Sequence, residues 1–206
     1  MRGVVLCGGE SKRMGSDKGL LSIGSDSWSM LAFRKLESLN IPVAVSVNKM
    51  QELSYRNLFS PRPLILDQLI ARGPLRGLIS AHLSFPNDDL LVLACDMTEM
   101  DVKTLQHLQQ FVDTLPGYDY YVFGSENFIE PLCAVYSSAA LKKLYKDLSK
   151  GRLLNFSLHK LIRVGNYKTL TITDPKKFTN HNTLNFPQKP PPSAAGITIG
   201  PADTKR

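Results

Sequence analysis

Short runs of apolar residues alternate along this chain with stretches in which apolar side chains have helical spacing. Residues 90–94 form the clearest run and contain no polar side chain. Continuous apolar strands are typical of a parallel sheet that is covered on both faces. Further short runs occur at residues 4–6, 43–47 and 64–66, and helical spacing occurs at residues 30–39, 75–82 and 102–112. The alternation predicts an α/β fold with a doubly wound, mostly parallel sheet and helices on both faces, whose ligands bind beyond the carboxyl ends of the strands.

The second half of the chain is less regular. Residues 120–123 and 133–136 predict two more strands, joined by an excursion through the residues between them. Two helices are expected there as well, at about residues 138–148 and 153–162.

The composition changes after Phe186 to a proline-rich segment without apolar periodicity. Segments of this kind bury too little apolar surface to pack against a core. We therefore expect one domain over residues 1–186 and a disordered tail over residues 187–206.

The overall composition is that of an ordinary globular protein. The chain has 206 residues, of which 43% are hydrophobic and 21% charged. No apolar run approaches the ~20 residues that a membrane helix needs. We therefore expect a cytoplasmic protein that does not associate with a membrane. The net charge of +7 is spread along the chain without a lysine or arginine block, which argues against nucleic acid as a partner. Cys7, Cys95 and Cys133 lie far apart without a C-x-x-C pair, so the sequence predicts buried thiols in place of a zinc site or disulfides.

A glycine pair directly follows the first apolar run and opens a loop that contains two cations. Gly8 and Gly9 allow backbone N–H groups to approach a ligand closely, and Arg13 and Lys18 could clamp a polyphosphate. The spacing differs from that of the P-loop, and the G-x-G-x-x-G dinucleotide fingerprint is absent. A flexible turn with solvated cations would explain the glycines and one lysine alone. The complete string favours a site for the phosphates of a nucleotide.

The string resembles the signature loop of the molybdenum cofactor guanylyltransferases, in which a strand is followed by Gly-Gly-x-Ser-x-Arg-Met-Gly-x-Asp-Lys. Every defined position of that pattern is present here, as Gly8, Gly9, Ser11, Arg13, Met14, Gly15, Asp17 and Lys18. The similarity extends from the N-terminus to about Leu184. Within the loop region, Cys7 stands where the family usually has alanine, which is a change between two small residues.

An aspartate follows the strand that is expected at residues 90–94. In a doubly wound sheet, Asp96 would lie on the same rim as the glycine loop, where its carboxylate could hold Mg²⁺. A turn or helix-capping role is the alternative for this residue considered alone. The segment resembles the Cys-Asp-x-Pro motif of the family, with Thr98 in place of proline, and the resemblance implies that Asp96 is the metal ligand.

Three further positions match nucleotide-contacting residues of the family. Asp67 could accept two hydrogen bonds from the N–H groups on one edge of guanine, or it could be a turn residue. Asn48 could contact the nucleotide or cap a helix. Gly73 opens a Gly-Pro-Leu-Arg-Gly turn that could admit the base or ribose, or serve tight packing. The complete nucleotide-binding set that the resemblance implies is Leu6, Cys7, Gly8, Gly9, Lys18, Asn48, Asp67, Gly73 and Asp96.

The acceptor side has fewer signals. Asn180 and Asn182 belong to an Asn-x-Asn-Thr string that resembles one linked in the family to the pterin substrate. Glu130 and the proline after it lie where the family often has His-Pro, and this resemblance assigns them no function.

Taken together, these residues and the resemblance imply a nucleotidyltransferase. It would use Mg²⁺ to transfer GMP from GTP to molybdopterin and release pyrophosphate, with Lys18, Arg13 and Asp96 as catalytic residues. A contact with enzymes that insert or accept the cofactor is also expected. The alternatives are a cytidylyltransferase of the same pathway, a sugar-phosphate nucleotidyltransferase, or a module that delivers the cofactor without catalysis.

Overall fold

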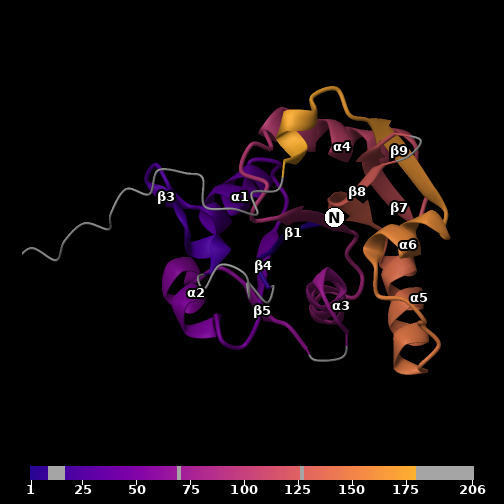
Figure 1. Cartoon of the computed structure of the whole chain (residues 1–206), viewed down its shortest axis with the longest axis horizontal. Helices are drawn as coiled ribbons and strands as arrows, with labels where there is room; N and C mark the ends of the chain where they lie inside the picture. Colours follow the sequence, from indigo (N-terminus) through magenta and orange to yellow (C-terminus); the bar gives the residue numbers. More distant parts are fainter. Residues whose placement is uncertain (9–16, 69–70, 126–127, 180–206) are drawn as a thin grey trace, which may run out of the picture.

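A twisted sheet of seven strands runs through the computed structural model, which describes residues 1–8, 17–68, 71–125 and 128–179 (Figure 1). The strand order is β5 (Leu64–Leu66), β4 (Val43–Val47), β1 (Arg2–Leu6), β6 (Leu90–Ala94), β8 (Ile129–Tyr136), β7 (Tyr120–Gly124) and β9 (Tyr167–Thr171). β8 is antiparallel to both of its neighbours, and the other pairs in this sheet are parallel. The carboxyl ends of β1, β4, β5, β6, β7 and β9 therefore lie along one rim of the sheet.

Helices cover both faces of the sheet because neighbouring strand residues point in opposite directions. Val5 points to a core that includes residues of α1 (Trp28–Glu37), α2 (Glu52–Phe59) and α4 (Val102–Thr114). Val4 points to a second core, which includes residues of α3 (Pro74–Ser84), α5 (Ser138–Ser149) and α6 (Leu158–Arg163). The short elements are the 3-10 helices η1 (Lys18–Leu20) and η2 (Pro175–Phe178), and the two-residue strands β2 (Ser22–Ile23) and β3 (Asp26–Ser27).

The helix starts follow from the local sequence. The side chains of Ser27, Asp101 and Ser137 each accept a hydrogen bond from the backbone N–H three residues later, which satisfies one of the free donors at the first turn of α1, α4 and α5. α3 begins at Pro74, whose fixed φ suits the first helical position and whose missing N–H is not needed there.

The predicted fold class is confirmed, and so are the strands and helices expected in the first half. The helix α2 and the strand β9 were not expected from the sequence, and neither were the short elements η1, η2, β2 and β3. β8 begins at Ile129, earlier than expected, and α6 begins at Leu158, later than expected. The expected domain end at residue 186 and the proline-rich tail lie outside the described residues. In the part of the chain that is described, no helix is long and apolar enough to cross a membrane.

Candidate active site

The rim of the sheet brings Lys18 and Asp96 together. Register pairs Leu6 of β1 with Ala94 of β6, so the chain segments that follow these two strands leave the sheet side by side. Lys18 begins η1, and its Nζ lies 3.3 Å from Oδ2 of Asp96. The two side chains are 19% and 17% exposed, so their charges interact in an environment partly shielded from water. Two residues that are 78 positions apart thus form one charged centre at the strand ends.

Asp17 has a structural role at the base of the glycine loop. Its carboxylate accepts hydrogen bonds from the backbone N–H of Gly19, from Nε2 of Gln51 and from the hydroxyl of Tyr55, at 3.0, 2.7 and 3.1 Å. Tyr55 is fully buried in α2, and burial raises the pKa of its phenol, so the hydroxyl stays protonated and donates. These bonds fix the residue that immediately precedes Lys18 in the sequence.

Gln51 connects the two ends of the glycine loop. Besides its bond to Asp17, its Nε2 donates to the carbonyl of Cys7 at 3.1 Å, and its Oε1 accepts from the backbone N–H of Asn48 at 2.9 Å. The Asn48 side chain accepts in turn from the N–H groups of Met50 and Gln51, which forms a turn ahead of α2. The first residue of that helix is Glu52, so Asn48 is not its N-cap.

Asp67 lies against Gly8. One carboxylate oxygen accepts a hydrogen bond from the Ser46 hydroxyl at 2.5 Å. A Cβ at position 8 would lie only 2.1 Å from the other oxygen, so any side chain there would force the Asp67 carboxylate to move. Burial raises the pKa of the Asp67 carboxyl, although the bond from Ser46 and the charge of Arg76 partly oppose this. Asp67 is only partly buried, and the structure places it beside the backbone of the predicted phosphate loop.

The two glycines of the Gly-Pro-Leu-Arg-Gly turn are needed for different structural reasons. Gly73 has φ +59°, a left-handed conformation that favours glycine, and a Cβ there would meet no atom within 4 Å. At Gly77, a Cβ would lie 2.6 Å from Oγ of Ser46, so this glycine allows α3 to pack closely on the sheet.

Thr98 replaces the proline that the resemblance would supply after Asp96. It is buried, and its carbonyl accepts a hydrogen bond from Nζ of Lys35 at 2.6 Å. Within the described residues its hydroxyl has no hydrogen-bond partner. Lys35 of α1 therefore holds this turn through the backbone carbonyl of Thr98.

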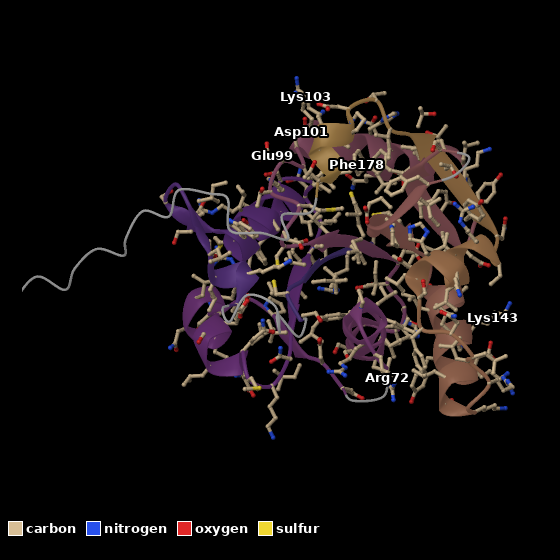
Figure 2. The ribbon with its side chains drawn as sticks, viewed as in Figure 1. Arg72, Glu99, Asp101, Lys103, Lys143 and Phe178 are labelled. Atoms are coloured by element: carbon tan, nitrogen blue, oxygen red, sulfur yellow. The ribbon has the colours of Figure 1, made fainter. Side chains whose placement is uncertain are left out.

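An apolar cavity of about 370 Å³ lies farther along the same rim, beyond β8. It is lined by residues at the ends of β7 and β9, at the start of β8 and in η2, namely Gly124, Ser125, Phe128, Thr171, Ile172, Pro175 and Phe178. Phe178 packs on Phe123 with ring centroids 4.9 Å apart. Nζ of Lys177 pairs with Asp101 at 2.7 Å, which ties η2 to the start of α4; Figure 2 shows Asp101 and Phe178 close to each other at this edge. No motif in the sequence indicated this cavity.

Glu130 is a buried carboxylate beside the charged centre that sequence reasoning did not assign. It is 5% exposed, and its Oε1 accepts a hydrogen bond from the N–H of Leu132 at 2.8 Å. Burial raises the pKa of this carboxyl to about 7; the bond from Leu132 opposes that shift, and the negative charge of Asp96 adds to it. The residue after it is a proline, and this Glu-Pro pair was the signal that could have drawn attention to it.

Some predicted site residues lie outside the described part of the chain, namely Gly9, Arg13, Asn180 and Asn182. Among the residues that are described, no group of three or more histidine, cysteine, aspartate or glutamate side chains could hold a metal ion. The predicted buried thiols are found at Cys7, Cys95 and Cys133, each free.

The comparison with protein families decides the class of this site. Residues 3–164 match the family described as the MobA-like NTP transferase domain. The chain belongs to this family. The predicted enzyme class, a nucleotidyltransferase, is thereby confirmed, and a resemblance to molybdenum cofactor guanylyltransferases is borne out by the relatives that follow.

Individual relatives match much of the length of the chain in sequence, and a solved structure matches its fold. A probable molybdenum cofactor guanylyltransferase of Methanothermobacter thermautotrophicus is 32% identical over 151 residues, which cover 72% of this chain and 77% of that protein. One of Pelotomaculum thermopropionicum is 28% identical over 162 residues, covering 79% of this chain and 76% of that protein. The crystal structure of molybdopterin-guanine dinucleotide biosynthesis protein A from Archaeoglobus fulgidus has a TM-score of 0.71 at 19% identity and covers 89% of this chain and 93% of that one.

Proposed function

We propose that this protein transfers GMP from GTP to the phosphate of molybdopterin, which forms a guanine dinucleotide cofactor and releases pyrophosphate. The observation that carries the proposal is the Lys18–Asp96 centre, 3.3 Å between Nζ and Oδ2, at the rim where the phosphate-loop sequence leaves β1. The names of the relatives, as molybdenum cofactor guanylyltransferases, support guanine as the base and molybdopterin as the acceptor.

Asp96 suits a divalent ion because its carboxylate is held at the strand ends and partly exposed. Mg²⁺ is usually held by one or two carboxylates together with substrate phosphates, so a site with few protein ligands fits it. Asp96 would hold the ion. When bound, Mg²⁺ supplies positive charge that neutralises phosphate oxygens during transfer.

The chain's own residues position the phosphates. An oxygen of the acceptor phosphate forms a bond to the α-phosphorus of GTP, and the bond to the bridging oxygen of pyrophosphate breaks in line. The backbone at Gly8 and Gly9, with Arg13, would bind the β- and γ-phosphates. Lys18 would donate to an oxygen on the α-phosphorus, where negative charge is greatest in the transition state. A general base is not needed, because a phosphate monoester is ionised near neutral pH.

The base would lie toward β4 and β5. Asp67 would accept from the two N–H groups on one edge of guanine, and its place beside Gly8 puts it next to the phosphate loop. The backbone at Leu6 and Cys7, with Asn48 and Gly73, would complete the nucleoside contacts.

The acceptor would lie on the other side of Asp96. The apolar cavity between β7, β9 and η2 is large enough for a bicyclic ring and opens on the same rim. Asn180 and Asn182 follow η2 closely in the sequence and would add polar contacts to the pterin. We place the reaction in the cytoplasm, with transient transfer of the product to cofactor-inserting enzymes.

The test is a pyrophosphate assay with purified protein, Mg²⁺, molybdopterin and each of the four ribonucleoside triphosphates. We expect release with GTP that depends on molybdopterin. Preference for CTP would identify a cytidylyltransferase, and activity with a sugar phosphate as acceptor would identify a sugar nucleotidyltransferase. Binding of molybdopterin without release from any triphosphate would indicate a delivery module.

A further inference from the structure

Glu130 lies near the charged centre, but the mechanism above gives it no role. The residue is 5% exposed, and among the described residues its side chain accepts a hydrogen bond from the N–H of Leu132 at 2.8 Å. Within residues 1–8, 17–68, 71–125 and 128–179, no lysine, arginine or histidine forms an ion pair with it. A buried carboxylate that carries its charge without a cation is unfavourable, so a cation at this place would stabilise the site.

An irregularity in the sheet sets the position of Glu130. β7 and β8 pair Val122 with Ala134 and then Phe123 with Glu130, so one step along β7 corresponds to four along β8. Such bulges bend a strand and redirect a side chain, and they are frequent beside active sites. The position of Glu130 therefore depends on this local distortion of β8.

Glu130 and Asp96 lie at the same end of the β6–β8 strand pair. β6 and β8 are antiparallel, with Leu93 opposite Cys133. Asp96 is three residues after Leu93 and Glu130 is three residues before Cys133, so both lie beyond this pair toward the same rim. The negative charge of Asp96 also helps to raise the pKa of the Glu130 carboxyl, in agreement with this placement at the ends of the strands.

Glu130 also lies next to the apolar cavity. The residue after Phe123 on β7 is Gly124, which pairs with Ile129 and lines that cavity. In strand order, β8 separates β6, which leads to Asp96, from β7. The carboxylate thus stands between the nucleotide side and the acceptor side of the rim.

We propose that Glu130 is a second protein ligand of the divalent ion that Asp96 holds, and that it fixes the ion on the side facing the acceptor cavity. The inference rests on the proposed function for the nature of that ion. Two carboxylates with substrate phosphates are a common set for Mg²⁺ and Mn²⁺, because both ions prefer oxygen ligands. A purely structural role, accepting from Leu132, is the alternative.

The variant Glu130→Gln separates the two roles. Its amide oxygen can still accept from the N–H of Leu132, but the charge that a metal ligand needs is lost. Glu37→Gln is the matched control, because Glu37 is an exposed carboxylate at the end of α1. Thermal unfolding without metal checks the fold of each variant, and we expect Glu130→Gln to be at least as stable as wild type.

The experiment measures Mn²⁺ binding by the electron paramagnetic resonance signal of the free ion. The full chain is titrated with GTP present and the acceptor omitted, so that no turnover occurs, and GTP alone is the blank. We expect Glu130→Gln to raise the Mn²⁺ dissociation constant about tenfold or more, in the range that altered metal-site residues produce. Glu37→Gln should stay within twofold of wild type.

Asp96→Asn distinguishes failure of this inference from failure of the proposed function. If Asp96→Asn abolishes Mn²⁺ binding and Glu130→Gln leaves the dissociation constant within twofold, Glu130 is not a ligand and the inference is overturned. If Asp96→Asn also has no effect, or wild type binds no more Mn²⁺ than the blank, the metal centre itself is wrong and the proposed function fails with it.

Discussion

The two ends of the functional rim are built differently. Around Lys18, polar side chains from separate elements fix one another: Asp17 accepts three hydrogen bonds, and Gln51 joins Cys7 to it. Around the cavity at β7 and β9, most lining side chains are apolar, and Phe178 comes from a short 3-10 helix near the end of the described chain. A site that must hold several phosphate charges needs fixed donors, whereas a ring system needs apolar walls. The comparison therefore supports the proposed division, in which the nucleotide binds at the Lys18 side and the acceptor binds at the cavity.

The largest effect on transfer is expected for a substitution of Asp96, which lies between the two sides. Asp96→Asn keeps the size of the side chain and removes the charge that holds the ion, so transfer should fall by about 10³-fold or more, since stabilisation of developing charge is a dominant contribution to such reactions. Binding of GTP without metal should change little. Pyrophosphate release and fluorescence titration of the nucleotide measure the two quantities. If the Asp96→Asn variant turned over at a near-normal rate, Asp96 would have no catalytic role on the nucleotide side.

Lys18→Gln should have the next largest effect. Loss of one preorganised charged donor to the transferred phosphoryl group lowers kcat by about 10²-fold. Lys49→Gln is the control, because Lys49 is exposed beyond the end of β4. A steady-state comparison should show the loss mainly in kcat; a rise in KM for GTP with unchanged kcat would mean that Lys18 only binds the triphosphate.

Phe178→Leu tests the acceptor side alone. The smaller side chain changes the cavity wall, so the KM for molybdopterin should rise about three- to tenfold while the affinity for GTP stays constant; a missing apolar contact of this size is worth about 1 kcal/mol or more. Phe111→Leu is the control, since Phe111 packs on Tyr121 and does not line the cavity. Equal changes in the KM values for both substrates would show that the two sides are not separate.

The smallest expected effect concerns the tie between η2 and α4. The hydrogen bond from Lys177 holds the pKa of the Asp101 carboxyl at about 2, below its ordinary value of 3.8. Asp101→Asn can still cap α4 but loses the ion pair, so the free energy of unfolding should fall by at most about 1 kcal/mol, because the pair is partly exposed and water screens it. A carboxyl group whose pKa is lowered in the folded state stabilises the fold at pH values above its ordinary pKa. This stabilisation is lost as the pH falls toward 2. Urea unfolding should therefore show a difference at pH 7 that disappears near pH 2; a constant difference would point to lost helix capping.

The sequence predicted the nucleotide side better than the acceptor side for a physical reason. Gly8 and Lys18 belong to one contiguous string after a strand, and Asp96 follows another strand, so topology alone brings them to one rim. Gln51 was missed because its role depends on tertiary contacts of the turn ahead of α2 with Cys7 and Asp17. Glu130 was not assigned because a bulge that no local pattern reveals sets its position.

The cavity could not have been inferred from sequence either. Its walls come from segments that are separated by about fifty residues and meet only because β9 pairs with β7, and β9 itself was not expected. Antiparallel pairing of β8 with both neighbours was likewise not specified in the prediction. The residues that form apolar walls, such as Phe178, have no chemistry that sets them apart from ordinary core residues.

The central claim is that GMP, and no other part of GTP, passes to the acceptor. The direct measurement uses GTP labelled with ³²P at either the α- or the γ-position, with Mg²⁺ and molybdopterin, and separates the dinucleotide product from pyrophosphate. We expect α-label in the product and γ-label only in pyrophosphate. Label from the γ-position in the product would show phosphoryl transfer from the other end of the triphosphate and would contradict this account.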